Sequence, residues 1–86
     1  MVELFYVYIL FSKTSNRFYI GQTNDIKERL NRHNSGFEKS TKPYKPWELI
    51  GFIEKNNRSE AMILEKKLKN LNTEDLKKFI SKYFKN

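Results

Sequence analysis

Two short apolar runs near the N-terminus, separated by a polar turn, limit the folds open to this chain more than any other stretch. The first run, Leu4 to Phe11, contains only apolar or aromatic residues. It is too short for a typical helix, so we expect a central strand buried on both faces. The second run, Arg17 to Gly21, follows the turn Ser12 to Asn16. Together they predict a β-hairpin with a loop of about four or five residues.

The register of this hairpin decides which side chains share a face of the sheet. A loop of about four residues predicts Tyr8 opposite Tyr19, whereas about five predicts Tyr8 opposite Ile20. The sequence leaves both registers open. Gly21 predicts a point where the backbone leaves the sheet or a ligand comes close.

A first helix is predicted after the hairpin. Asp25 is a good N-cap, and Glu28 has capping-box spacing from it. The pattern predicts a helix to about Asn34, stopped by Ser35-Gly36. The following segment, Phe37 to Pro46, is rich in lysine and proline, which favours a loop that serves as a contact surface.

The second half of the chain predicts one strand and two helices. Trp47 to Lys55 is typical of a strand, and Asn57 caps a helix that runs to about Leu71. Asn72-Thr73 starts a third helix, and Phe84 to Asn86 are expected to fray. The expected buried positions of these two helices are Ala61, Leu64, Leu68, Leu71, Leu76, Phe79, Ile80 and Tyr83.

The element order β-β-α-β-α-α predicts an α/β (α+β) fold, with a small three-stranded, mainly antiparallel sheet flanked by three helices. At 86 residues, the chain from 1 to 86 is expected to form a single domain. It has no cysteine, no apolar run that could span a bilayer and no signal-peptide pattern. We therefore expect a soluble, cytoplasmic protein that does not act at a membrane.

The charge balance points toward a polyanionic partner. Seventeen Lys and Arg against ten Asp and Glu give a net charge of +7. Such a balance favours nucleic acid binding. A lysine-rich surface that only improves solubility explains the charge equally well.

Five polar residues stand at positions where core is expected: Tyr8, Tyr19, Arg29, His33 and Glu65. Each has an ordinary structural explanation. The tyrosines could be rim aromatics, and His33 could favour the C-terminal dipole of its helix. Arg29 could pair with Asp25, and Glu65 with Lys69.

Taken together, these residues suit phosphodiester hydrolysis. A carboxylate can hold a hard divalent cation that polarises a phosphoryl oxygen. An arginine fork can bind the non-bridging oxygens, and a tyrosine or histidine can take a proton from water. Buried charges such as Arg29 and Glu65 require partners or a cleft, which agrees with a shared site.

The motifs resemble those of the GIY-YIG nuclease superfamily. Tyr6-Val7-Tyr8 and Tyr19-Ile20-Gly21 resemble its paired motifs, with Val7 preceded by Tyr6 instead of glycine. Arg29 and His33 match its first-helix arginine and the histidine or tyrosine four residues on, and Glu65 matches its metal-binding glutamate. The chain most resembles the small stand-alone bacterial branch, whose members are described as excinuclease-like. Gln22 stands where the DNA-repair branch often has lysine.

The resemblance implies a metal-dependent DNA endonuclease. Glu65 would hold one Mg²⁺ or Mn²⁺, Arg29 would stabilise the pentavalent phosphorus, and Tyr19, assisted by Tyr8 or His33, would activate water. Which of these three is the general base stays open. Cleavage would be structure-selective or weakly sequence-specific, with branched or damaged DNA as candidate substrates.

Target choice must come from the basic surface or from a protein partner. The residues expected to contact DNA are Arg32, Lys39, Lys42 and Lys45. Two alternatives are a non-catalytic nucleic-acid-binding module and a nuclease component that depends on a partner. Binding that falls with salt is expected of the module whether or not Glu65 is present.

Overall fold

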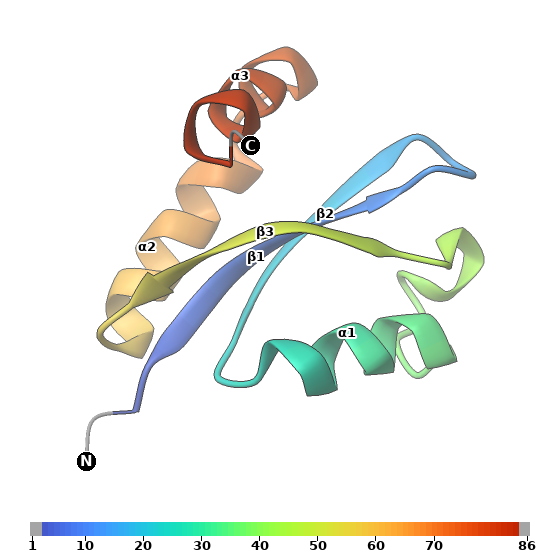
Figure 1. Ribbon diagram of the computed structural model, residues 1–86, viewed down its shortest axis with the longest axis horizontal. Coiled ribbons are helices and arrows are strands. Elements are labelled where there is room, and N and C mark those ends of the chain that lie inside the picture. The colour runs from blue at the N-terminus through green and yellow to red at the C-terminus, as the bar shows by residue number, and fades with distance from the viewer. Residues whose placement is uncertain (1–2, 85–86) are drawn as a thin grey trace.

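The computed structural model describes residues 3–84, and its element order confirms β-β-α-β-α-α (Figure 1). The secondary-structure elements are β1 Phe5–Ser12, β2 Arg17–Thr23, α1 Ile26–Ser35, the 3₁₀ turn η1 Lys42–Tyr44, β3 Glu48–Lys55, α2 Arg58–Lys69 and α3 Thr73–Tyr83. Within residues 3–84 no helix is long and apolar enough to cross a membrane.

The three strands form one antiparallel sheet in the order β2-β1-β3. The central position of β1 explains its continuous apolar sequence, because both of its faces are covered. A bulge in the β1–β3 pairing lies between Ile9 and Leu10. Since β2 pairs only with β1, its other edge is free of strand pairing among the described residues.

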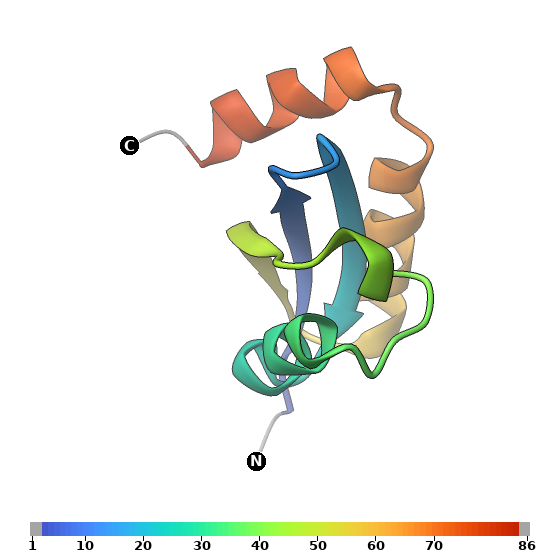
Figure 2. The same cartoon turned by 90° about the vertical axis from the view of Figure 1, so that its right-hand side faces the viewer.

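Helices cover both faces of the sheet. In Figures 1 and 2, α1 lies on one side of the strands and α2 and α3 lie on the other. The core is divided accordingly. Val7, Ile9 and Ile20 pack with α2 and α3, whereas Tyr8, Leu10 and Trp47 pack on the α1 side.

The helix starts follow the predicted caps. The side chains of Asp25, Asn57 and Asn72 each accept a hydrogen bond from a backbone N–H three residues later. Gly36 ends α1 in the left-handed conformation, with φ of 85°. Helix α2 ends at Lys69, two residues before the expected end at Leu71.

The structure corrects the predicted hairpin register. Tyr8 lies opposite Gly21, and Tyr19 lies opposite Leu10, so neither expected pairing of Tyr8 is present. The reason is Ser12, which belongs to β1 and not to the turn. Ser12 is fully buried and its hydroxyl donates to the Tyr44 carbonyl, which extends the strand by one residue.

Two predictions about the C-terminal helix are wrong. Tyr83 is 57% exposed, and its ring stacks on Phe79 outside the core. Phe84 does not fray, because its ring packs on Gly51 and joins the cluster beneath α2 and α3. A glycine at position 51 leaves room for that ring. The other residues expected to fray, 85 and 86, lie outside the described part of the chain.

Candidate active site

Tyr8 and Tyr19 lie on the same face of neighbouring strands, with ring centroids 6.2 Å apart. Gly21, opposite Tyr8, makes this arrangement possible. A β-carbon at Gly21 would lie 2.5 Å from Tyr8 Oη and 3.1 Å from the Tyr19 ring. The glycine is therefore required by the close approach of Tyr8, and the strand continues beyond it to Thr23.

His33 on α1 completes an aromatic cluster with the two tyrosines. Its Nε2 atom lies 3.0 Å from Tyr8 Oη, and its ring centroid lies 4.7 Å from that of Tyr19. Both His33 and Tyr8 are buried, at 1% and 2% exposure. Tyr19 is only half-buried, so it is the more accessible of the two tyrosines.

The hydrogen bonds of Thr41 assign the proton of His33 to Nδ1. The Thr41 hydroxyl donates to the Glu38 carbonyl, so the oxygen accepts from His33 Nδ1, 2.9 Å away. With its proton on Nδ1, the neutral ring presents an unprotonated Nε2, which accepts the Tyr8 hydroxyl proton. Thr41 is itself buried, and its carbonyl accepts a hydrogen bond from Trp47 Nε1 at 3.0 Å.

The surroundings shift the pKa values of both partners. Burial, and after it the nearby Tyr19, raise the pKa of Tyr8, and the positive charge of Arg29 only partly opposes this. Burial lowers the pKa of His33, although Glu38 partly opposes it. At neutral pH we therefore expect a protonated phenol that donates to a neutral imidazole.

Arg29 and Glu65 approach this cluster from opposite faces of the sheet. The charges of both residues act on Tyr8: that of Arg29 lowers the pKa of the phenol and that of Glu65 raises it. Glu65 projects from α2 to the free edge of β2, where Gln22 Nε2 donates to its Oε1 atom at 3.0 Å. Direct contacts thus join Tyr8, Tyr19 and His33 on the α1 side and Glu65 with Gln22 on the α2 side, while the charges of Arg29 and Glu65 act on Tyr8.

Of the two ion pairs that could explain Arg29 and Glu65 without a shared site, only the pair of Glu65 is present. Glu65 does pair with Lys69, whose Nζ lies 2.8 Å from Oε2. Arg29 forms no ion pair with Asp25 or any other carboxylate of residues 3–84, and its buried Nε atom has no hydrogen-bond partner there.

The residues around Glu65 suit a hard cation with few protein ligands. No cluster of three or more His, Cys, Asp or Glu side chains that could hold a metal occurs in the described part of the chain. Mg²⁺ is often held by one or two carboxylates and keeps several waters. Next to Glu65, the buried Gln22 Oε1 atom has no partner, so it could accept from such a water. Lys69 is 53% exposed along its side chain and can move aside.

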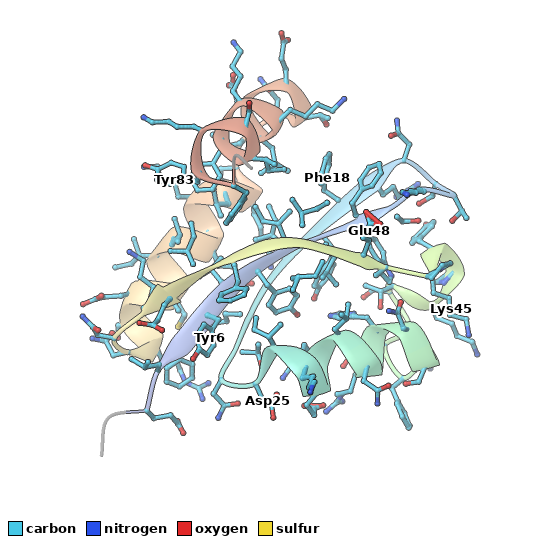
Figure 3. The ribbon with its side chains drawn as sticks, viewed as in Figure 1. Tyr6, Phe18, Asp25, Lys45, Glu48 and Tyr83 are labelled. Atoms are coloured by element: carbon cyan, nitrogen blue, oxygen red, sulfur yellow. The ribbon has the colours of Figure 1, made fainter. Side chains whose placement is uncertain are left out.

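The residues expected to contact DNA lie at the far end of α1. Arg32 is held by Glu28 at 3.9 Å and Glu38 at 3.2 Å. Lys39, Lys42 and Lys45 have exposed side chains and lie in or next to η1 along the chain. Figure 3 shows Lys45 at the end of the molecule opposite to Tyr6.

Two contacts in the candidate site are not predicted by the sequence. They are the contact of Thr41 with His33 and that of Gln22 with Glu65. Thr41 lies in the lysine-rich loop, eight residues from His33 along the chain. Its sequence neighbours give no sign of burial. Gln22 stands out only because it follows the conspicuous Tyr19-Ile20-Gly21 motif.

Two tyrosines, an imidazole, an arginine and a carboxylate around the β1–β2 pair are the groups that phosphodiester hydrolysis requires. A family model of the GIY-YIG catalytic domain matches residues 4–79. The chain is also similar to the solution NMR structure of the UPF0213 protein BH0048 from Bacillus halodurans. The two are 30% identical, the alignment covers 95% of this chain and 87% of that one, and the TM-score is 0.64. No match was found among curated proteins. This chain belongs to the GIY-YIG nuclease family, as its motifs indicated.

Proposed function

We propose that this protein is a divalent-metal-dependent DNA endonuclease, with a structure-selective or weakly sequence-specific activity carried by one nuclease domain over residues 1–86. The observation that carries the proposal is the hydrogen bond from Tyr8 Oη to His33 Nε2, in which the phenol also feels the charges of Arg29 and Glu65. A phenol with a neutral imidazole as proton acceptor can act as a general base toward water.

The proton path follows from the assigned tautomer. As water attacks phosphorus, Tyr8 Oη takes a proton from the water and passes its own proton to His33 Nε2. The new O–P bond forms while the bond from phosphorus to the leaving sugar oxygen breaks, and that oxygen takes a proton from solvent. Since the pKa of His33 is lowered, the imidazolium readily releases its proton afterwards.

The other residues position and stabilise the reacting phosphate. Arg29 would bind its non-bridging oxygens through a guanidinium that has no carboxylate partner within residues 3–84. Tyr19, half-buried against His33, would orient the attacking water. Glu65, with Gln22 beside it, would hold Mg²⁺ or Mn²⁺, which when bound supplies Lewis acidity at a phosphoryl oxygen.

Target choice is proposed to come from basic residues around η1 and the end of α1, with help from a protein partner if one exists. Lys39, Lys42 and Lys45 would contact backbone phosphates, and Arg32 would join them after leaving its two carboxylates. Such contacts position DNA without reading sequence. Branched or damaged DNA is the proposed substrate, and a cytoplasmic location is the corresponding expectation.

A cleavage assay tests the proposal. Supercoiled plasmid and a branched duplex are incubated with Mg²⁺ or Mn²⁺, with a chelator control, using the parent protein, Glu65→Gln and Glu60→Gln. Glu60 is an exposed carboxylate on the same helix. We expect Glu65→Gln to cleave about a hundredfold more slowly or worse, since a metal contributes several kcal/mol to such reactions.

Equal cleavage by all three proteins would contradict the proposal. DNA binding without cleavage by the parent would instead favour the non-catalytic module, in which Lys69 permanently neutralises Glu65.

A further inference from the structure

A cavity of about 250 Å³ lies where the end of β2 meets the side chains of α1 and α2. It is lined by Phe5, Gln22, Thr23, Asn24, Arg29 and Arg58. Two of these residues are arginines and none is acidic. Two carboxylates bond to its amide side chains, Glu3 to Asn24 at 3.4 Å and Glu65 to Gln22 at 3.0 Å.

The two arginines have charge available for a ligand. Neither Arg29 nor Arg58 forms an ion pair with a carboxylate of the described residues, whereas Arg32 has two such partners. The Arg29 Nε atom is buried with no partner there, which is costly for a hydrogen-bond donor. The Arg58 guanidinium is held over the Phe5 ring, 5.0 Å from its centroid.

The cavity shares two of its walls with the candidate active site. Arg29 lines the cavity while its charge acts on Tyr8. Gln22 lines it while donating to Glu65. A ligand in the cavity would therefore lie directly beside the phosphate that Arg29 is expected to bind.

We propose that this cavity is a second phosphate-binding subsite, in which Arg58 holds a backbone phosphate of the nucleic acid next to the phosphate that is cleaved. The proposal rests on a nucleic acid as the substrate. Two arginines without a carboxylate partner among the described residues, and no lining carboxylate, favour an anion, and the planar fork of arginine matches phosphate oxygens. Stacking on Phe5 fixes the direction of Arg58 before the substrate arrives, which reduces the entropy lost on binding.

The salt dependence of binding tests the subsite. Fluorescence anisotropy with a fluorescein-labelled branched duplex, in EDTA and over a series of salt concentrations, compares the parent with Arg58→Gln, Arg58→Lys and Lys78→Gln. Glutamine retains an apolar stem over Phe5. Lys78 is an exposed residue of α3, so Lys78→Gln removes the same net charge at a distance from the cavity.

For Arg58→Gln we expect the slope of log K against log salt to fall by about 0.9, the value for one phosphate contact, and affinity at 0.1 M salt to weaken about five- to tenfold. Arg58→Lys should keep the slope, because its charge remains, and Lys78→Gln should match the parent. The subsite is refuted if Arg58→Gln and Lys78→Gln change the slope equally, or if Arg58→Lys loses as much slope as Arg58→Gln. Because EDTA prevents metal-dependent cleavage, this assay measures binding alone. If binding depends on Arg58 but the protein fails to cleave DNA in the separate assay with Mg²⁺ or Mn²⁺, the proposed nuclease activity is overturned while the phosphate-binding subsite is retained.

Discussion

At the scale of the residue, His33 is informative because it is the chain's single histidine. Its ring lies between two hydroxyls, with Thr41 on Nδ1 and Tyr8 on Nε2. Buried rings of this kind are oriented by both partners. The Thr41 hydroxyl therefore acts on Tyr8 through the imidazole, which makes Thr41 a positioning residue.

We predict that ¹⁵N NMR of the parent shows His33 neutral, protonated on Nδ1, with a pKa below its ordinary value of about 6.5. Thr41→Val keeps the side-chain shape but removes the acceptor for Nδ1–H, so the population of this tautomer should fall. Thr41→Ser keeps the hydroxyl and should retain the parent tautomer. A single histidine makes each spectrum unambiguous.

If Thr41→Val leaves the tautomer unchanged, Thr41 does not set the proton position and the assigned proton path loses its support. If Thr41→Ser behaves like Thr41→Val, the effect comes from packing beside Trp47 and not from the hydroxyl.

The sequence singled out the candidate site residues but not their hydrogen-bond partners. Arg29 and His33 were conspicuous because polar residues interrupted an otherwise apolar helix stripe. Thr41 could not be found in this way. Its burial depends on how the loop after α1 folds back under Trp47, and a loop has no periodicity that marks an inward side chain.

At the scale of the element, the pairing of β1 with β2 sets the distance between the tyrosines. Residues directly opposite each other in an antiparallel pair have β-carbons about 5 Å apart, and diagonal neighbours are farther apart. Tyr8 and Tyr19 are diagonal neighbours. Tyr8 lies opposite Gly21, so the ring of Tyr8 can lie over a position without a side chain.

Gly21→Ala should destabilise the fold by about 1–3 kcal/mol, as overpacking does, and should displace the Tyr8 hydroxyl. Any DNA cleavage should then fall steeply even well below the unfolding temperature. Thermal unfolding and a cleavage assay measure the two effects separately.

Gly51→Ala is the matched control. Its new β-carbon would lie 2.5 Å from the Phe84 ring, on the side of the sheet that packs against α3. We expect a similar loss of stability with cleavage retained at low temperature. Equal loss of cleavage in both variants would mean that general destabilisation, and not the position of Tyr8, explains the result.

The elements themselves were largely predictable, whereas the register was not. Capping residues such as Asp25 and Asn57 act within one turn of the chain, so local sequence is enough to find them. The register depends on Ser12, a polar residue that the pattern assigned to the turn. Ser12 is buried through its bond to Tyr44, which is 32 residues away along the chain.

At the scale of the whole molecule, the candidate site is assembled across an edge of the sheet. Tyr8, Tyr19 and His33 belong to the core on the α1 side, while Glu65 comes from the helix on the opposite face. Strand β2 contributes to both sides, because Tyr19 contacts His33 and Gln22 contacts Glu65. Neither the α1 side nor the α2 side of the sheet carries all five candidate groups. The proposed cleavage therefore requires α1 and α2 to pack on the same sheet.

In the proposed mechanism, the Tyr8 hydroxyl takes the proton from water. The most direct measurement is the single-turnover rate of branched-duplex cleavage by the parent, Tyr8→Phe and Tyr6→Phe. Tyr6 lies on the same strand and packs edge-to-face against Phe52, with ring centroids 5.5 Å apart, so Tyr6→Phe removes a hydroxyl outside the Tyr8–His33 contact. We predict a loss of about 10²–10⁴-fold for Tyr8→Phe, the usual contribution of general-base catalysis, and a parental rate for Tyr6→Phe. A Tyr8→Phe protein that cleaves at the parental rate would contradict the account.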